Sequence, residues 1–191
     1  MRCKRKLWSI GQIIYIFMTS AIYFSLIAAM TIVLNIRNIE YMNDWGKVLG
    51  TLAFSNVPLV KGTAVTISTY ILTYFTPAQA MFFTWLSSVL CGGILGLIIY
   101  GCNVISKSKV VGIAASGFLV ILSAAVSGNE MAQWFSPVSW TTLNKLDVGK
   151  LTQYPTFTYV MVVYMTAIII LSVWIIKVIE KKDVGVMIRE V

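Results

Sequence analysis

The residue types that most often carry catalysis or bind metals are scarce in this sequence of 191 residues. It has no histidine, which excludes His-ligated haem, histidine zinc sites and catalytic pairs with a histidine base. Its three cysteines, Cys3, Cys91 and Cys102, lack the spacing of a metal motif or a disulfide framework. No GxxxxGK[ST] phosphate loop is present. We therefore expect no catalytic residue, no metal, no cofactor and no enzyme activity, and any ATP hydrolysis would belong to a partner.

Threonines form the most regular polar pattern in the sequence. Thr63, Thr66, Thr69, Thr73 and Thr76 follow one another at steps of three or four, which places them on one face of an α-helix. Two interpretations are open: an interfacial helix on the outer leaflet with its threonines toward water, or a re-entrant helix whose threonines face a pathway or a partner. We take Thr63, Thr66, Thr69 and Thr73 as candidate pathway residues.

A second distinctive segment is Trp134-Phe-Ser-Pro-Val-Ser-Trp140, which is aromatic and turn-prone. Pro137 is expected to end one helical stretch, and Ser136 or Ser139 to cap the next. The segment is too apolar to lie in water. It therefore predicts an outer hairpin of two short helices that dips into the outer leaflet, with Trp134, Pro137 and Trp140 as its candidate residues.

Composition defines the elements that must position these residues. Hydrophobic residues make up 58% of the chain and charged residues 12%, against about 25% charged in a soluble domain. This predicts an all-α integral membrane protein with a single transmembrane domain over residues 1–191. Spans are expected at about 7–36, 78–104, 110–127 and 157–176, and outer segments at about 37–77 and 128–156.

A fifth span is possible within residues 48–76, and two observations favour four. Lys61 would lie near mid-membrane in a fifth span, at a cost of about 2.5–3.5 kcal/mol. Four spans also place both basic termini on the cytoplasmic side of the plasma membrane. The ten Lys and Arg positions then placed inside are 2, 4, 5, 6, 107, 109, 177, 181, 182 and 189, and the five placed outside are 37, 47, 61, 145 and 150.

The formal net charge is +8, with 15 Lys and Arg against 7 Asp and Glu. Because these basic residues flank apolar runs, they predict contacts with lipid head groups, and no nucleic acid is expected as a partner. No acidic residue lies within the four predicted spans, which weighs against a proton- or sodium-coupled transporter. Gly92 and Gly96 form a GxxxG pair that indicates either close helix packing or ordinary span composition.

Several short segments, in this order and topology, resemble the permease subunits of ABC-2-type transporters. Phe135-Ser-Pro-Val-Ser-Trp140 resembles the outer hairpin between the last two spans of that family, and Glu180-Lys-Lys-Asp-Val184 resembles its closing signature. The run from Asn43 to Leu52 is similar to an outer-loop element of Gram-positive permeases, as Arg5-Lys-Leu-Trp8 followed by Gln12 is to the start of a span. The resemblance covers nearly the whole chain. It would correspond to spans three to six of six, without a counterpart of the first two spans, as expected of a naturally short half, a fragment or one piece of a split permease.

The resemblance implies a mechanism and a set of partners. Two permease subunits would pack together in the bilayer, and two separate ABC ATPase subunits would bind their cytoplasmic side. ATP binding would close the ATPase dimer and move the permease helices as packed units. Arg5, Lys6 and Trp8 are the candidate coupling residues, although topology and lipid anchoring also explain them. The implied function is export of, or immunity to, a hydrophobic or amphipathic substrate such as an antimicrobial peptide.

Another class of protein fits the same sequence. A membrane immunity or scaffold protein that does not transport could bind a toxin or partner through its outer segments. Protection against the toxin in cells without the ATPase would distinguish this class from a permease.

Overall fold

The computed structural model describes residues 5–38, 44–47, 50–51, 69–106, 109–126, 129, 131–147 and 153–181. Among these residues there is no strand, and one isolated bridge joins Asp147 to Thr156. The predicted all-α class is confirmed. The elements are α1 (Arg5–Asn35), η1 (Ile36–Asn38), α3 (Thr69–Tyr74), α4 (Pro77–Ser106), α5 (Lys109–Ala125), η3 (Met131–Phe135), η4 (Ser139–Thr141), η5 (Leu143–Lys145) and α6 (Phe157–Lys181), where η marks a 3-10 helix.

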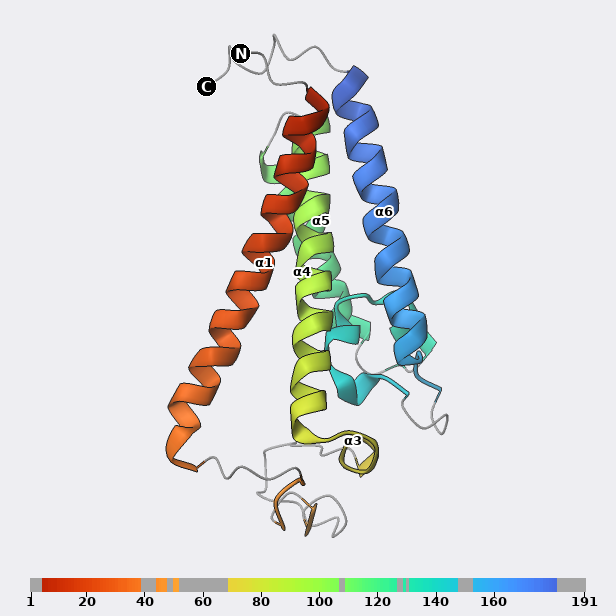
Figure 1. Cartoon of the computed structure of the whole chain (residues 1–191). Coiled ribbons are helices and arrows are strands. Elements are labelled where there is room, and N and C mark those ends of the chain that lie inside the picture. Colours follow the sequence, from red (N-terminus) through yellow and green to blue (C-terminus); the bar gives the residue numbers. More distant parts are fainter. Residues whose placement is uncertain are drawn as a thin grey trace.

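Three of these helices are long and apolar enough to cross a membrane: Lys6–Asn35, Pro77–Ser106 and Phe157–Glu180. The fourth, α5, is apolar but has only 17 residues. At 1.5 Å per residue it is about 25 Å long, which is slightly less than the hydrocarbon thickness of a bilayer. The hairpin segments η3, η4 and η5 follow α5 directly and lie beside the lower parts of α4 and α6 (Figure 1).

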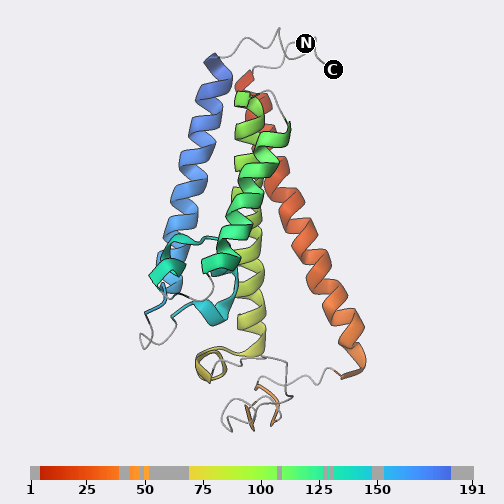
Figure 2. The same cartoon turned by 180° about the vertical axis from the view of Figure 1, so that it is seen from behind.

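The helices α1, α4, α5 and α6 run alternately down and up, so that the chain leaves the bundle at the end where it entered (Figures 1 and 2). A salt bridge of 3.4 Å between Lys6 Nζ and Glu180 Oε1 joins the start of α1 to the end of α6 there. We call this the closed end. The opposite end, where α1 finishes and α4 and α6 begin, is the open end, because α1 diverges from α4 toward it (Figures 1 and 2).

The start of α4 is fixed by its local sequence. Thr76 Oγ1 accepts a hydrogen bond from the Gln79 N–H (3.3 Å), and Gln79 Oε1 accepts one from the Thr76 N–H (3.1 Å). This is a capping box, with Pro77 at the first helical position where its missing N–H costs nothing. The prediction that Thr76 continues the threonine face of one helix is therefore wrong. Thr76 ends that pattern because its hydroxyl caps the next helix.

Helix α4 lies at the centre of the bundle, and small residues bring its neighbours close. A Cβ atom on Gly92 would lie 2.6 Å from Ser20 Oγ of α1, and Gly96 faces Ile16 of the same helix. On α5, a Cβ atom on Gly112 would lie 2.6 Å from the Ile99 carbonyl oxygen of α4. In lipid, such close backbone approach replaces the hydrophobic driving force that water would supply.

Two apolar clusters form on α4, one toward each end. The closed-end cluster joins Leu97 and Val104 of α4 to Ile175 and Ile179 of α6. The open-end cluster joins α4 to the hairpin and to α6. Its buried members are Ala80, Cys91, Ile94, Trp140, Leu143, Leu146, Val160 and Tyr164. The hairpin therefore packs into the bundle at the open end, where α1 does not.

Candidate functional site

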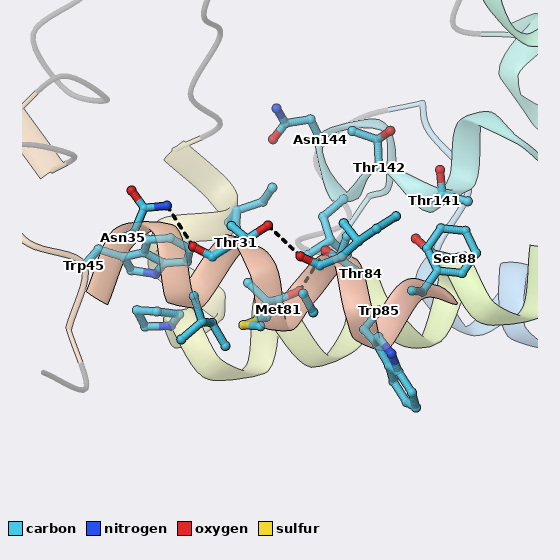
Figure 3. Close-up of a pocket in the computed structure, with 18 of the residues that line it drawn as sticks. Thr31, Asn35, Trp45, Met81, Thr84, Trp85, Ser88, Thr141, Thr142 and Asn144 are labelled. Atoms are coloured by element: carbon cyan, nitrogen blue, oxygen red, sulfur yellow. Dashed lines mark hydrogen bonds between the residues drawn. The ribbon is translucent and has the colours of Figure 1, made fainter. Parts of the chain in front are cut away.

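A cavity of about 860 Å³ lies at the open end between α1 and α4, and α3, Trp45 and the η4–η5 segments complete its wall (Figure 3). We call it the α1–α4 cleft. Its apolar and aromatic lining includes Phe24, Ile27, Met81 and Trp85. Its polar lining residues are Thr31, Asn35, Thr84, Ser88, Thr141, Thr142 and Asn144.

The floor of the cleft is a close contact between α1 and α4. Ser20 Oγ donates a hydrogen bond of 3.0 Å to the Val89 carbonyl oxygen, and Gly92 lies against Ser20 and Phe24. Closer to the open end, Trp85 Nε1 donates a hydrogen bond to Ser25 Oγ across the two helices (3.1 Å). The glycine contact therefore fixes how far the cleft extends into the bundle.

Three polar side chains of the cleft donate a hydrogen bond to a carbonyl of their own helix. Thr31 Oγ1 donates to the Ile27 carbonyl (2.9 Å), and Thr84 Oγ1 donates to the Ala80 carbonyl (2.8 Å). Asn35 Nδ2 donates to the Thr31 carbonyl oxygen (2.9 Å). A threonine hydroxyl has one proton and two lone pairs, so these side chains present oxygen acceptors to the cavity. Among the described residues that line the cleft, none is Lys, Arg, Asp or Glu.

The hairpin forms one wall of the cleft and is fixed by aromatic side chains. Trp140 Nε1 donates to the Gln133 carbonyl (2.7 Å), and Tyr164 Oη of α6 donates to the Pro137 carbonyl (2.6 Å). Trp134 Nε1 donates to the Gln153 carbonyl (2.8 Å). Non-helical backbone at membrane depth is stable only where its polar groups find partners within the protein. These donors add to the backbone bonds that the Gln133 and Pro137 carbonyls accept from the Ser136 and Trp140 N–H groups.

The structure corrects the predicted caps of the hairpin. Val138 is the N-cap of η4 and makes no side-chain capping bond. Instead, the Ser136 and Ser139 hydroxyls pair with each other at 2.9 Å, and Ser139 Oγ is 3.5 Å from the Ser123 carbonyl at the end of α5. Both serines are buried. A buried hydroxyl needs a partner in the protein, and the tight turn at Pro137 brings these two together.

The predicted site residues fall into separate places. Trp134, Pro137 and Trp140 come together in the hairpin. Thr69 and Thr73 lie on α3, where Thr73 is exposed and donates to the Thr69 carbonyl (3.2 Å), and neither lines the cleft. The other two candidate pathway residues, Thr63 and Thr66, lie outside the described residues.

The candidate coupling residues lie at the closed end. Arg5 is the first residue of α1, and Lys6 makes the salt bridge to Glu180. Trp8 is 49% exposed, and its ring centroid is 6.3 Å from that of Tyr100 on α4. The first turn of α1 therefore contacts both α4 and α6 and still presents surface to its surroundings.

Sequence reasoning missed the cleft residues Thr31 and Thr84 and the hairpin anchor Tyr164. The first two lie within apolar runs, in which a single threonine carries no periodic signal. Tyr164 lies 27 residues after Pro137, on a different element. The local motif Thr76-Pro-Ala-Gln79 does indicate the start of a helix at Pro77, because it has the residue pattern of a capping box.

The fold defines an all-α membrane protein, and near one end it holds an amphipathic cavity whose described lining residues carry no charge. Among the described residues, no three His, Cys, Asp or Glu side chains gather where they could hold a metal ion. Comparison with known proteins finds no matching family model, no matching curated protein and no matching solved structure.

Proposed function

We propose that this chain is the permease subunit of an ABC-2-type transporter in the plasma membrane of a Gram-positive bacterium. In this proposal it exports, or protects against, a hydrophobic or amphipathic substrate such as an antimicrobial peptide. A separate ATPase supplies the energy, and a second permease subunit completes the transporter. The resemblance of the hairpin and chain-end segments to that family supports the assignment.

The observation that carries the proposal is the difference in charge between the two ends of the bundle. Five of the eight described Lys and Arg residues lie at the closed end: Arg5, Lys6, Lys109, Lys177 and Lys181. The three others are Arg37, Lys47 and Lys145. An excess of basic residues marks the cytoplasmic side, where an ATPase would bind. The cleft, which has no charged side chain among its described lining residues, then opens toward the outer side.

The first turn of α1 supports coupling to an ATPase at that end. Trp8 is half-exposed and contacts Tyr100, and Lys6 reaches Glu180 on α6. A force on this turn would therefore reach α4 and α6 together. Such linked motion is what the packed-unit mechanism requires.

The test is ATP-driven uptake of a fluorescent amphipathic peptide into inside-out membrane vesicles. The full chain is co-expressed with the ATPase subunits of its host, one at a time. We expect uptake with one of them, loss of uptake with a hydrolysis-deficient form of that ATPase, and at least a fivefold decrease in Trp8→Ala. Tyr15→Ala is the matched control, because Tyr15 is an aromatic residue on α1 with 65% exposure. Absence of ATP-dependent uptake with every ATPase would overturn the proposal.

A second candidate function has its own support in the hairpin. Met131 and Phe135 of η3 are 74% and 84% exposed, on a segment otherwise fixed to the bundle by hydrogen bonds. Two exposed apolar side chains on a fixed support are suited to binding a toxin without transport. Protection of cells that lack the ATPase, lost in Met131→Ser/Phe135→Ser, would favour this membrane immunity function.

A further inference from the structure

We propose that the α1–α4 cleft binds one uncharged lipid whose polar end donates hydrogen bonds, that is, a lipid with a glycerol or sugar head group. This inference goes beyond the proposed transport function, because it requires neither ATP nor an ATPase.

The position of the cleft gives it access to lipid. It lies between two helices that are each long and apolar enough to cross a membrane, and it begins where these helices diverge (Figures 1 and 2). The residue on α1 nearest the open end is Asn35, and Phe24 lies 11 residues, or about 16 Å, deeper. Along α1, a molecule that enters sideways would meet Asn35 and Thr31 before it meets Ile27 and Phe24. Lipids of the adjacent leaflet have this order of polarity.

The charge of the lining selects the head group. A phosphate-bearing head group buried in protein is normally held by Arg or Lys. The described residues around the cleft offer hydroxyl, amide and indole groups instead, with no ionised side chain among them. The cleft therefore favours a neutral head group over a phosphodiester.

The hydrogen-bonding groups of the lining restrict the class of ligand further. Thr31 and Thr84 lie on facing helices, and each donates its hydroxyl proton to a carbonyl of its own helix. What they offer a ligand is an oxygen acceptor, and Asn35 adds its amide oxygen. A ligand that donates hydrogen bonds, as the hydroxyls of glycerol and sugars do, matches these acceptors. Figure 3 shows the polar side chains of the lining on α1, on α4 and on the η4–η5 segments.

The size of the cavity is suitable for one ligand. About 860 Å³ lies within the 300–1,000 Å³ typical of cavities that hold one small molecule. Apolar residues dominate its lining, as they do in such sites. The glycine contact at Gly92 closes the floor and limits how deeply a chain can enter.

Native mass spectrometry of the full chain in detergent tests the proposal. The probes are dioleoylglycerol, monoglucosyl-dioleoylglycerol and dioleoyl phosphatidylcholine, which share the same acyl chains. We expect one bound molecule of either hydroxyl-headed lipid, with at least tenfold weaker binding of phosphatidylcholine. Equal binding of all three probes, or preference for phosphatidylcholine, would overturn the proposal.

Two pairs of variants locate the site. Ala28 lines the cleft and its neighbour Ala29 does not, so Ala28→Phe should abolish binding while Ala29→Phe retains it. Thr31→Val/Thr84→Val keeps the shape and removes both acceptors, which should weaken binding about tenfold. Thr166→Val is the control for the second pair, because Thr166 is exposed on α6 and donates within its own helix in the same way.

If Ala28→Phe fails to fold, Thr31→Val/Thr84→Val still tests the site, because valine has nearly the same shape as threonine. Circular dichroism and gel filtration check each variant. Binding that persists in Ala28→Phe, or falls equally in Thr166→Val, would place the lipid elsewhere and refute the cleft. Binding of an amphipathic peptide, but of none of the lipids, would refute the ligand class.

Discussion

At the closed end of the bundle α1 packs against α4 and α6, whereas at the open end α1 leaves α4 and a cleft takes the place of the contact. The same two helices behave differently because their facing residues differ in size. Gly92 and Gly96 face α1 toward the closed end. About two to four turns before them on α4, Met81 and Trp85 line the cleft.

The comparison also shows two ways of satisfying polar groups in a membrane protein. Toward the closed end the long helices satisfy their own backbone, and small residues allow them to pack closely. At the open end the backbone of η3–η5 is irregular, and donors from Trp140 and Tyr164 satisfy its carbonyls. Close packing gives stability, while irregular backbone and a diverging helix leave room for a ligand.

The largest expected effect comes from breaking the close packing of α4 and α5. Gly112→Ala places a Cβ atom 2.6 Å from the Ile99 carbonyl oxygen, and a backbone atom cannot rotate away. We expect a loss of about 3 kcal/mol in the free energy of unfolding, at the upper end of overpacking effects. Thermal unfolding in detergent measures it. Gly117→Ala is the control, because a Cβ atom there meets nothing within 4 Å; an equal loss in both variants would contradict the packing argument.

The second prediction tests the fixed hairpin at the open end. Tyr164→Phe removes the donor to the Pro137 carbonyl while keeping a fully buried ring. The Pro137 carbonyl keeps the Trp140 N–H (3.3 Å) as a partner, so the loss of this one hydrogen bond should cost about 1 kcal/mol. Faster amide exchange confined to residues 131–147 would show that the hairpin has loosened. Tyr159→Phe is the control, since the Tyr159 ring contacts Trp134 and Trp140 but does not anchor Pro137; loosening in both variants would argue against a role for the Tyr164 hydroxyl.

The sequence predicts the positions of the long apolar helices better than it predicts where they end. Charge-free runs locate all four long helices, because a span must exclude charge over most of its length. They locate helix ends less well, since the end of an apolar run does not end a helix. Helix α6 continues past residue 176 to Lys181, where Lys177 and Glu180 are helical and exposed.

The hairpin and the cleft show where local sequence stops being sufficient. The aromatic and proline composition of 134–140 predicts compact structure, but the partners of its carbonyls lie on other elements. The cleft depends on the angle between α1 and α4, which is set by the glycine contacts deeper in the bundle. Thr31 and Thr84 become a pair only through that angle, so no spacing within the sequence indicates it.

A smaller effect is expected at the boundary between the two ends. Ser20→Ala removes the hydrogen bond from Ser20 Oγ to the Val89 carbonyl at the floor of the cleft. Interhelical hydrogen bonds in membranes contribute about 0.6 kcal/mol, so unfolding should shift only slightly. Spin labels at Ala29 and Ala78 should show a broader distance distribution if this bond limits the opening of the cleft. Ser123→Ala is the control, because that hydroxyl donates within α5; an unchanged distribution in Ser20→Ala would show that glycine packing alone sets the floor.

The smallest effect is expected at the tip of the closed end, where Lys6 and Glu180 pair at 3.4 Å with exposed side chains. An exposed pair contributes about 0.2–1 kcal/mol and is screened by salt. A double-mutant cycle with Lys6→Ala and Glu180→Ala should therefore give a small coupling energy. This coupling energy should disappear at a salt concentration of 0.5 M, where the Debye length is about 4 Å. Lys177→Ala removes a neighbouring charge of α6 and should show no coupling to Lys6→Ala. A coupling energy that persists in high salt would mean that the Lys6–Glu180 salt bridge is stronger than the exposure of its side chains indicates. This salt bridge would then stabilise the closed end together with the apolar packing.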